Sequence, residues 1–439
     1  MELKTAIHST KAIFKRLVPS PGHNPDAPPG GPATQLVQTG RHSPDGLVYV
    51  NPPLVRGTTV LAPTLGAWRE RAGLATRDKP RAAYGRFGTP TTSAFETAIA
   101  ELDGAYRALC FPSGLAACAH ALLAVCAPGG HVLVSEFAYW PLREFAETTL
   151  RQLGVDVEFF TEGNAEGVAR RFRPNTQALF LEAPASISFE VAAVDEIAAR
   201  ARAQRIWVVM DNTWATPLLF RPLDHGADIA VQSASKYIGG HSDCILGVAS
   251  CNEAAWGRLA ESAVRFGQTA SPDDLYQALR GLRTLPLRLQ QHGCSALALA
   301  AWLEQQPEVA VVRAPGLPSH PDHATFTRLF AGSSGLFSFV LRPCSEKQLG
   351  AFFDSLRLFG IGLSWGGYES LVVPLAARPS SAVGAPAQRG QLVRVHAGLE
   401  DVGDLIGDLQ AGLAAMRACA AEGPTIAVDR DDRTCAWHP

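Results

Sequence analysis

The chain has few lysines, little excess charge and no long apolar run, although it contains 439 residues. Its only lysines are Lys4, Lys11, Lys15, Lys79, Lys236 and Lys347. The formal net charge of -2 excludes the strong basic bias of proteins that bind nucleic acid or anionic membranes. No segment has the length and apolarity of a membrane span, and the basic start lacks the apolar core of a secretory signal. We therefore expect a cytoplasmic protein with no nucleic-acid or membrane partner, with an organelle transit peptide as the lesser alternative.

The nine cysteines form no pattern that indicates a disulfide framework or a zinc site. They are odd in number, scattered, and without a C-x-x-C pair. Free thiols in a reducing compartment are therefore expected. His320 and His323 stand in H-P-D-H without cysteine or carboxylate ligands at the spacing that zinc requires, so we expect no metal site.

The length predicts more than one domain, because a single ordinary core does not extend over 439 residues. Short apolar runs alternate with helical patterns in the first part of the chain. The runs predicted as strands are 108–111, 131–135, 178–182, 206–211 and 228–232. This alternation is typical of a mainly parallel sheet with helices on both faces. A helix is predicted from Ser93 to Gly104, with Ser93 and Glu96 forming a capping box.

A second α/β pattern follows a long helical stretch, 273–305, which is broken near Pro286. It comprises a strand at 335–341, a helix at 346–358, a strand at 391–396 and a helix at 402–419. We divide the chain into an N-terminal extension and arm (1–87), a large domain (88–282) and a C-terminal α/β domain (283–439). The Pro/Gly-rich first 33 residues and the polar tail from residue 420 are expected to be poorly ordered.

Two polar residues end neighbouring apolar runs at the predicted ligand edge of the sheet. Asp211 closes W-V-V-M-D, and Lys236 follows D-I-A-V-Q within S-A-S-K-Y-I-G-G-H-S-D. The carboxyl ends of parallel strands line the ligand crevice of such a sheet. Pyridoxal 5'-phosphate (PLP) requires this arrangement, because a lysine forms a Schiff base with its aldehyde and an aspartate keeps its pyridine nitrogen protonated.

Other residues at this edge suit the remaining parts of the same cofactor. Ser113 and Gly114 stand where a strand turns into a helix, and a helix N-terminus favours a phosphate. Ser233 and Ser235 add hydroxyl groups just before Lys236. Tyr139 follows the strand at 131–135 and can stack on a pyridine ring. Each of these residues alone has an ordinary alternative role as a helix cap, a turn residue or a core tyrosine.

Ordered motifs across the chain resemble one family. They are Y-G-R-F-G-T-P-T from Tyr84, F-P-S-G-L-A-A from Phe111, D-N-T-W-A-T-P from Asp211, Q-S-A-S-K-Y-I-G-G-H-S-D from Gln232 and G-L-R-T-L-P-L-R from Gly281. They resemble the Cys/Met-metabolism group of PLP-dependent enzymes. This resemblance implies the type I, aspartate aminotransferase-like α/β fold. That fold has a large, mainly parallel seven-stranded PLP-binding domain and a smaller C-terminal α/β domain.

The resemblance also implies roles for individual residues. Lys236 is expected to hold PLP as a covalent Schiff base, with Asp211 at the ring nitrogen and Tyr139 on the ring face. The expected phosphate contacts are Gly114, Leu115, Ser233 and Ser235, together with Tyr84 and Arg86 from a neighbouring subunit. Ser364, Trp365 and Arg394 are expected to bind the substrate, and Tyr84 and Tyr139 to assist Lys236 in catalysis. A shared site implies a homo-oligomer, which we expect to be a homotetramer built as a dimer of dimers.

Within this family, V-N-P-P-L-V-R-G-T-T-V from Val50 and S-W-G-G-Y-E-S-L from Ser364 resemble the bacterial cystathionine β-lyases. The implied reaction is PLP-dependent β-elimination of L-cystathionine, a thioether amino acid, to homocysteine, pyruvate and ammonia in methionine biosynthesis. The alternatives are a cystathionine γ-lyase, a γ-synthase, an O-acylhomoserine sulfhydrylase, a cystine or cysteine-S-conjugate β-lyase, and a catalytically idle cofactor-binding protein. Trp140 departs from the small or acidic residue usual after the stacking tyrosine, so we expect it to reshape the pocket.

Overall fold

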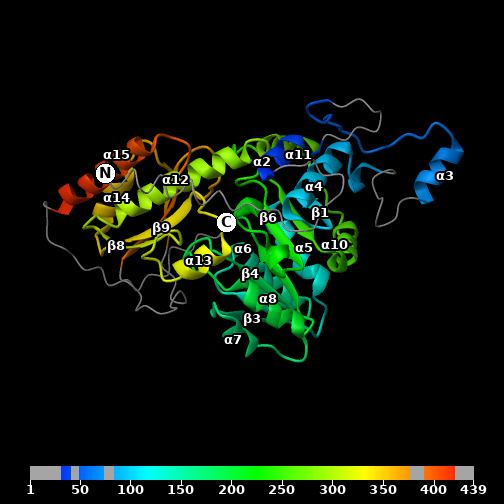
Figure 1. Ribbon diagram of the computed structural model, residues 1–439, viewed down its shortest axis with the longest axis horizontal. Coiled ribbons are helices and arrows are strands. Elements are labelled where there is room, and N and C mark those ends of the chain that lie inside the picture. Colours follow the sequence, from blue (N-terminus) through cyan, green and yellow to red (C-terminus); the bar gives the residue numbers. More distant parts are fainter. Residues whose placement is uncertain (1–30, 41–48, 74–83, 376–389, 421–439) are drawn as a thin grey trace.

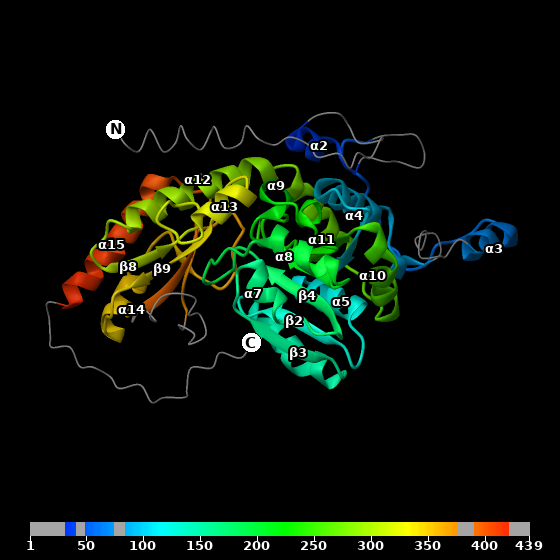
Figure 2. The ribbon, with the colours of Figure 1, turned by 60° about the horizontal axis from the view of Figure 1, so that its bottom comes forward.

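The computed structural model describes residues 31–40, 49–73, 84–375 and 390–420. The segments expected to be poorly ordered fall almost entirely on residues 1–30 and 421–439, which lie outside the described residues. Figures 1 and 2 show a larger and a smaller lobe, with the long helix α12 (Leu285–Leu303) running from one to the other. The predicted break near Pro286 is confirmed, because α11 (Pro272–Leu282) ends just before α12 begins.

The larger lobe is built on a seven-stranded sheet within the described residues. Its strands are β1 (Arg107–Phe111), β2 (His131–Ser135), β3 (Asp156–Phe160), β4 (Thr176–Glu182), β5 (Trp207–Asp211), β6 (Ile229–Ser233) and β7 (Gly247–Cys251). Their order is β1-β7-β6-β5-β4-β2-β3. Only β7 runs antiparallel to its neighbours. The predicted mainly parallel sheet is therefore confirmed, although the sequence pattern missed β3 and β7.

Helices cover both faces of this sheet. They are α4 (Pro90–Asp103), α5 (Gly114–Val125), α6 (Trp140–Phe145) with a wider turn at Ala146–Leu150, α7 (Ala165–Ala169), α8 (Val194–Ala203), α9 (Thr216–Leu219), α10 (Glu253–Arg265) and α11. Successive strand residues point to opposite faces, so Val132 and Val134 enter one hydrophobic core and Leu133 enters the other. Burial on both faces explains why these strands are continuous apolar runs.

The predicted start of α4 is wrong. Thr89 is the N-cap, Pro90 is the first helical residue, and Thr89 and Thr92 form the capping box. A proline is well suited to the first helical position because its φ is already helical and its missing N–H is not needed there. Glu96 instead faces the sheet, where its carboxylate accepts the backbone N–H of Cys110 at 3.1 Å.

The smaller lobe contains a five-stranded sheet in the order β10-β11-β12-β9-β8. Its strands are β8 (Val309–Arg313), β9 (Leu336–Leu341), β10 (Gly360–Ile361), β11 (Leu371–Leu375) and β12 (Gln391–His396). Its helices are α13 (His323–Leu329), α14 (Glu346–Asp354) and α15 (Val402–Ala420). Phe339, Phe352 and Leu409 lie in its separate hydrophobic core. The domain boundaries at residues 87 and 282 stay a prediction.

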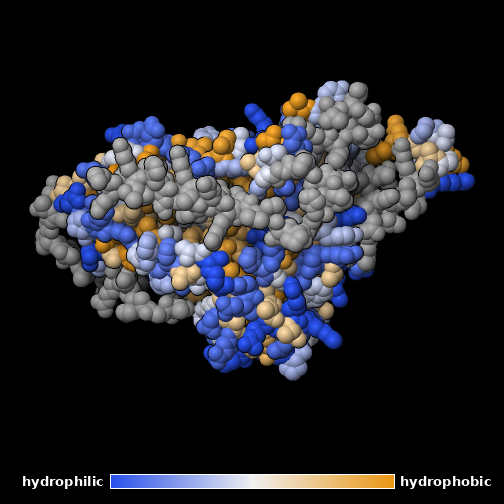
Figure 3. Space-filling view, in the orientation of Figure 1, coloured by the Kyte–Doolittle hydropathy of each residue, from blue (hydrophilic) through white to orange (hydrophobic). Residues whose placement is uncertain are grey.

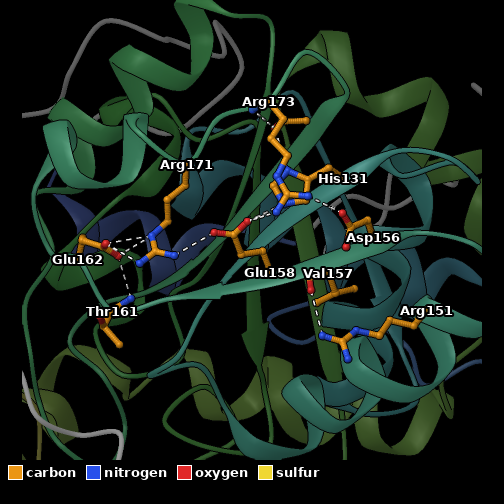
Figure 4. A network of polar contacts seen from close by, with 10 residues as sticks. His131, Arg151, Asp156, Val157, Glu158, Thr161, Glu162, Arg171 and Arg173 are labelled. Carbon is orange, nitrogen blue, oxygen red and sulfur yellow. Dashed lines mark hydrogen bonds and ion pairs between the residues drawn. The ribbon is translucent and has the colours of Figure 1, made fainter.

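Charged side chains cover the outer edge strand β3, as Figure 4 shows. Arg171 bonds Glu158 at 2.9 Å and Glu162 at 2.7 Å, and Arg173 pairs with Glu158 from the other side. Each pair is partly exposed and stabilises the fold modestly. A charged edge also opposes pairing with the strand of another molecule.

The N-terminal arm first packs on the body of the molecule through Leu36 and then leaves it. It contains α2 (Pro32–Gln38), α3 (Leu65–Gly73) and a short turn at Gly85–Phe87. The backbone N–H of Val55 donates to Thr91 on α4 at 2.8 Å, which fixes the start of the outer part of the arm. Beyond that point α3 projects outward in both ribbon views, and Figure 3 shows apolar atoms at this projecting end. Leu61, Leu65 and Trp68 are 83%, 61% and 57% exposed there.

Three further observations concern the described residues. Their eight cysteines are all free thiols. No group of three His, Cys, Asp or Glu side chains among them is arranged to hold a metal ion. None of the helices in the described ranges combines the length and apolarity needed to cross a bilayer.

Candidate active site

The candidate site lies at the carboxyl edge of the large sheet, where four segments end. Asp211 and Glu182 are the last residues of the parallel neighbours β5 and β4 and are paired in register. Tyr139 follows β2, and Lys236 follows β6. Parallel strands end at one crevice, so the structure brings Asp211, Tyr139 and Lys236 to the common edge that the sequence pattern predicted, and adds Glu182 to it.

Lys236 meets residues of the smaller lobe. Its Nζ donates to the Ser364 hydroxyl at 2.8 Å and lies 5.6 Å from the ring centroid of Trp365. Burial, and secondarily the charge of Arg394, lowers the pKa of Lys236 to about 8. A lysine with such a pKa is neutral in a substantial fraction of molecules near neutral pH, which a nucleophile or base requires.

The turn that carries Lys236 is held by a buried arginine. The guanidinium of Arg288 donates to the carbonyl oxygens of Tyr237 and Gly281, both at 2.8 Å. A Cβ at Gly240, whose φ is +73°, would lie 2.1 Å from this guanidinium. The backbone around Lys236 is therefore fixed before any ligand binds.

Asp211 is a buried carboxylate with only neutral partners among the described residues. Its Oδ1 accepts the N–H and hydroxyl of Thr213 at 2.9 and 2.6 Å, and its Oδ2 lies 3.6 Å from the Cys118 sulfur. Burial raises the pKa of Asp211 above its usual range. A cationic ligand group would therefore be stabilised beside it, which is the environment that a protonated pyridine nitrogen needs.

Glu182 is a second buried carboxylate, which our sequence reasoning did not assign. Its Oε2 accepts the backbone N–H of Tyr139 at 2.6 Å, and its Oε1 accepts that of Ser186 at 3.1 Å. Burial, followed by the charge of Asp211, raises the pKa of Glu182 to about 8. The Tyr139 side chain itself is 45% exposed, so a ring face is open to a ligand.

A glycine-lined cradle lies at the start of α5. The N-cap Ser113 uses its hydroxyl to accept the N–H of Ala116, while Gly114 and Leu115 keep first-turn N–H groups without intrahelical partners. A Cβ at Gly114 would lie 2.7 Å from the Cβ of Ser233. The hydroxyl of Ser235 bridges to the backbone of Leu246. Exposed N–H groups beside hydroxyls suit a phosphate dianion.

The side of the site that the smaller lobe contributes is lined by β12 and the preceding loop. Arg394 is 9% exposed, donates to the carbonyl oxygen of Leu363, and has a pKa lowered to about 10 by burial. His396 follows two residues later on the same face of β12 and contacts the loop after Trp365. Sequence reasoning missed His396, although the alternation of a strand would have placed it beside Arg394.

Two predicted site residues make no contact with Lys236 in the single chain, and a third residue expected to shape the pocket, Trp140, packs elsewhere. Tyr84 and Arg86 are exposed at the base of the arm and make no hydrogen bond or ion pair with Lys236, Asp211 or Tyr139 in the described structure. Arg86 instead lies over the ring of Phe87. Trp140 packs on the guanidinium of Arg143, 5.4 Å from its ring centroid, so the expected reshaping of the pocket stays a prediction.

The described residues fit the cofactor that their sequence motifs imply. Three features meet at one edge of the sheet. They are the buried carboxylate of Asp211, which has no cationic partner among the described residues, the amine of Lys236 with its low pKa, and the cradle at Gly114, which a side chain there would fill. These features correspond to the pyridine nitrogen, the aldehyde and the phosphate of PLP.

Comparisons with known proteins agree with this fit. The family model described as Cys/Met metabolism PLP-dependent enzyme matches residues 33–414. The cystathionine β-lyase MetC of Escherichia coli (strain K12) is 41% identical over 391 residues, which cover 87% of this chain and 98% of that protein. The L-alanine/L-glutamate racemase of Wolbachia pipientis wMel is 38% identical, covering 87% of this chain and 96% of that protein. A crystal structure of metB from Corynebacterium glutamicum superposes with a TM-score of 0.78 and 29% identity, covering 88% of this chain and 98% of that one.

Proposed function

Because the chain belongs to the family of Cys/Met metabolism PLP-dependent enzymes, we propose that it cleaves L-cystathionine by β-elimination. The products are homocysteine, pyruvate and ammonia. The main support for this proposal is the contact of Lys236 with Ser364 and Trp365. This contact places an amine of lowered pKa near the buried side chain of Arg394. PLP, held covalently by Lys236 when bound, supplies an electron sink that stabilises negative charge at the substrate Cα.

The side chains of the site supply binding and proton transfer. The Arg394 guanidinium binds the substrate α-carboxylate, because its planar fork matches two carboxylate oxygens. Once the substrate amine has taken the place of Lys236 on the cofactor, the freed neutral Nζ of Lys236 removes the Cα proton. The Cβ–S bond then breaks, its electron pair leaves with sulfur, and the Lys236 ammonium returns a proton to the homocysteine thiolate. Water converts the remaining three-carbon fragment to pyruvate and ammonia.

Further side chains are proposed to position the cofactor. Asp211 would hold the pyridine nitrogen and Tyr139 the ring face, while Ser364 and Trp365 line the substrate side. Gly114, Leu115, Ser233 and Ser235 would bind the phosphate. Their support is their common place at the carboxyl edge of the large sheet and at the N-terminus of α5.

Replacement of Lys236 by alanine tests this assignment. The variant is expected to bind PLP noncovalently, through the residues that hold its ring and phosphate, and to release no pyruvate. Lys347→Ala, at an exposed position on α14, is the matched control and is expected to keep wild-type turnover. Near-normal elimination by Lys236→Ala would refute the role of Lys236.

A second candidate function is amino-acid racemisation, which the 38% identical racemase of Wolbachia favours. Racemisation also begins with loss of the Cα proton, but it returns a proton to Cα and breaks no carbon–sulfur bond. The γ-lyases of the family break the Cγ–S bond and form 2-oxobutanoate instead of pyruvate. Incubation with L-alanine and L-glutamate, followed by chiral chromatography, separates racemisation from elimination.

We propose a homotetramer built as a dimer of dimers, in which Tyr84 and Arg86 complete the site of a neighbouring copy. The exposed apolar residues of the projecting arm, Leu61, Leu65 and Trp68, support contact with another chain. Light scattering coupled to size-exclusion chromatography tests the assembly, and a monomer would contradict it. The eight free thiols of the described residues support a reducing, cytoplasmic location.

A further inference from the structure

The turn that presents Ser364 and Trp365 to Lys236 is held from two sides. Ser364 accepts the Lys236 Nζ–H at 2.8 Å, and the Trp365 ring lies 5.4 Å from that of the buried Tyr237. The preceding Leu363 offers its carbonyl oxygen to Arg394. The substrate-facing groups of the smaller lobe therefore depend on the exact path of this turn.

The first side is the backbone that carries Lys236. Gly366 has φ +87°, and a Cβ there would lie 2.8 Å from the carbonyl carbon of Lys236 and from the nitrogen of Tyr237. The turn is thus pressed directly onto the Lys236 peptide, and only glycine allows this approach without strain. This contact sets the distance of the turn from the Lys236 peptide but supplies no hydrogen bond to the polar backbone groups of Gly366 and Gly367.

The second side is His396 at the end of β12. Its Nε2 lies 3.1 Å from the N–H of Gly366 and 3.1 Å from the carbonyl oxygen of Gly367. A neutral ring satisfies one of these groups at a time, by accepting or by donating, and either bond ties the turn to β12. His396 and Arg394 point to the same face of this strand, so one rigid element positions both the turn and the arginine.

We propose that His396 is a positioning residue for the elimination reaction, because it locks the Ser364–Gly367 turn against Lys236 through its Nε2. None of its contacts reaches the reacting atoms, so His396 acts only through Ser364, Trp365 and Leu363.

The surroundings of His396 keep it neutral. Burial, followed by the charge of His292 and then those of Arg394 and Lys236, lowers the pKa of His396 to about 3. Its ring is fully surrounded by Tyr237, His292 and the turn. It therefore serves as a hydrogen-bonding group rather than as an acid or base at any working pH.

Two amide replacements of His396 distinguish a role of Nε2 from a role of Nδ1. A glutamine amide reaches the place of Nε2, whereas an asparagine amide reaches only that of Nδ1. Glu and Asp are unsuitable because a charge would be buried there. His396→Gln is expected to stay within about threefold of wild-type KM, and His396→Asn to raise KM about tenfold with a smaller change in kcat, as for one lost hydrogen bond.

His292 offers a matched control because it is equally buried and its ring lies 5.1 Å from that of His396. It bonds the carbonyl oxygen of Ala397 through Nδ1 at 2.8 Å, so asparagine is its conservative replacement. His292→Asn is expected to leave KM unchanged. Equal KM in the two His396 variants, or a similar rise in His292→Asn, would overturn the positioning role.

A second readout is independent of substrate and of bound cofactor. This inference rests on the proposed function only through the use of L-cystathionine as substrate. In cofactor-free protein, the pH midpoint of Lys236 acetylation, followed by mass spectrometry, is expected to rise in His396→Asn. The reason is that a displaced turn relieves the burial that lowers the Lys236 pKa. An unchanged or lower midpoint would overturn the inference even if L-cystathionine were not the substrate.

Discussion

The depressed pKa of Lys236 makes a quantitative prediction for cofactor-free protein. With a pKa of about 8 instead of the ordinary 10.5, about one tenth of Lys236 amines are neutral at pH 7. The corresponding fraction for an ordinary lysine is about one in three thousand. At equal intrinsic nucleophilicity of the neutral amine, Lys236 should therefore react about 300-fold faster than an ordinary lysine at pH 7. The small number of lysines makes this measurable residue by residue.

Two substitutions should move the Lys236 midpoint in opposite directions. The charge of Arg394 lowers the pKa of Lys236, so Arg394→Met is expected to raise the midpoint. The charge of Glu369 raises that pKa, so the isosteric Glu369→Gln is expected to lower it. Because both side chains are close to the same amine, opposite shifts separate electrostatics from a general loosening of the site.

Pulsed acetic anhydride labelling between pH 6 and 10 provides the assay. After digestion, the peptide containing Lys236 is quantified against the exposed Lys347 in the same sample. The expected wild-type midpoint is near 8. A midpoint near 10, or shifts of the same sign in Arg394→Met and Glu369→Gln, would refute the account of this amine.

Three other predictions concern the assembly, the buried acids and the turn beside Lys236. In tetramers reassembled from equal amounts of Arg86→Ala and Lys236→Ala chains, each inactive alone, a site shared between subunits should restore about a quarter of wild-type activity, whereas a site within one chain would restore none. Burial and Asp211 raise the pKa of Glu182 to about 8 from 4.5, so the penalty on folding is absent below pH 4.5 and complete above pH 8. Urea denaturation of cofactor-free protein should therefore show a loss of stability between these pH values that is smaller in Glu182→Gln than in wild type by on the order of 4 kcal/mol, since other buried acids such as Asp103 also contribute, and parallel curves would contradict this. Gly366→Ala should lower the free energy of unfolding by about 1–3 kcal/mol through strain at φ +87°, and an unchanged urea midpoint would count against the tight contact with Lys236.

The sequence revealed those parts of the fold whose burial pattern is simple. Residues 132–134 and 207–210 are apolar because both faces of their strands are covered, and both strands were predicted. β7 was missed because Gly247 and Ser250 interrupt the β-branched pattern, although every residue of the strand is buried. Close packing explains the glycine, since a Cβ at Gly247 would collide with the carbonyl oxygen of Ser113 at 2.0 Å.

The sequence predicted site residues that follow the end of an apolar strand. It missed residues that act by holding another residue in place. Asp211 and Lys236 were found from their places after apolar runs. Glu182 ends β4 at the same edge and could have been found by the same rule. Arg288 and Tyr237, whose carbonyl oxygen it bonds, are 51 positions apart in the chain, and no local sequence pattern predicts such a hydrogen bond.

The most direct test of the central claim is identification of the products from L-cystathionine and purified, cofactor-loaded protein. Mass spectrometry of the keto acid and the thiol in one reaction determines which carbon–sulfur bond breaks. Pyruvate and homocysteine in equal amounts are the expected result. 2-Oxobutanoate with cysteine, or unchanged L-cystathionine beside a racemised amino acid, would contradict β-elimination.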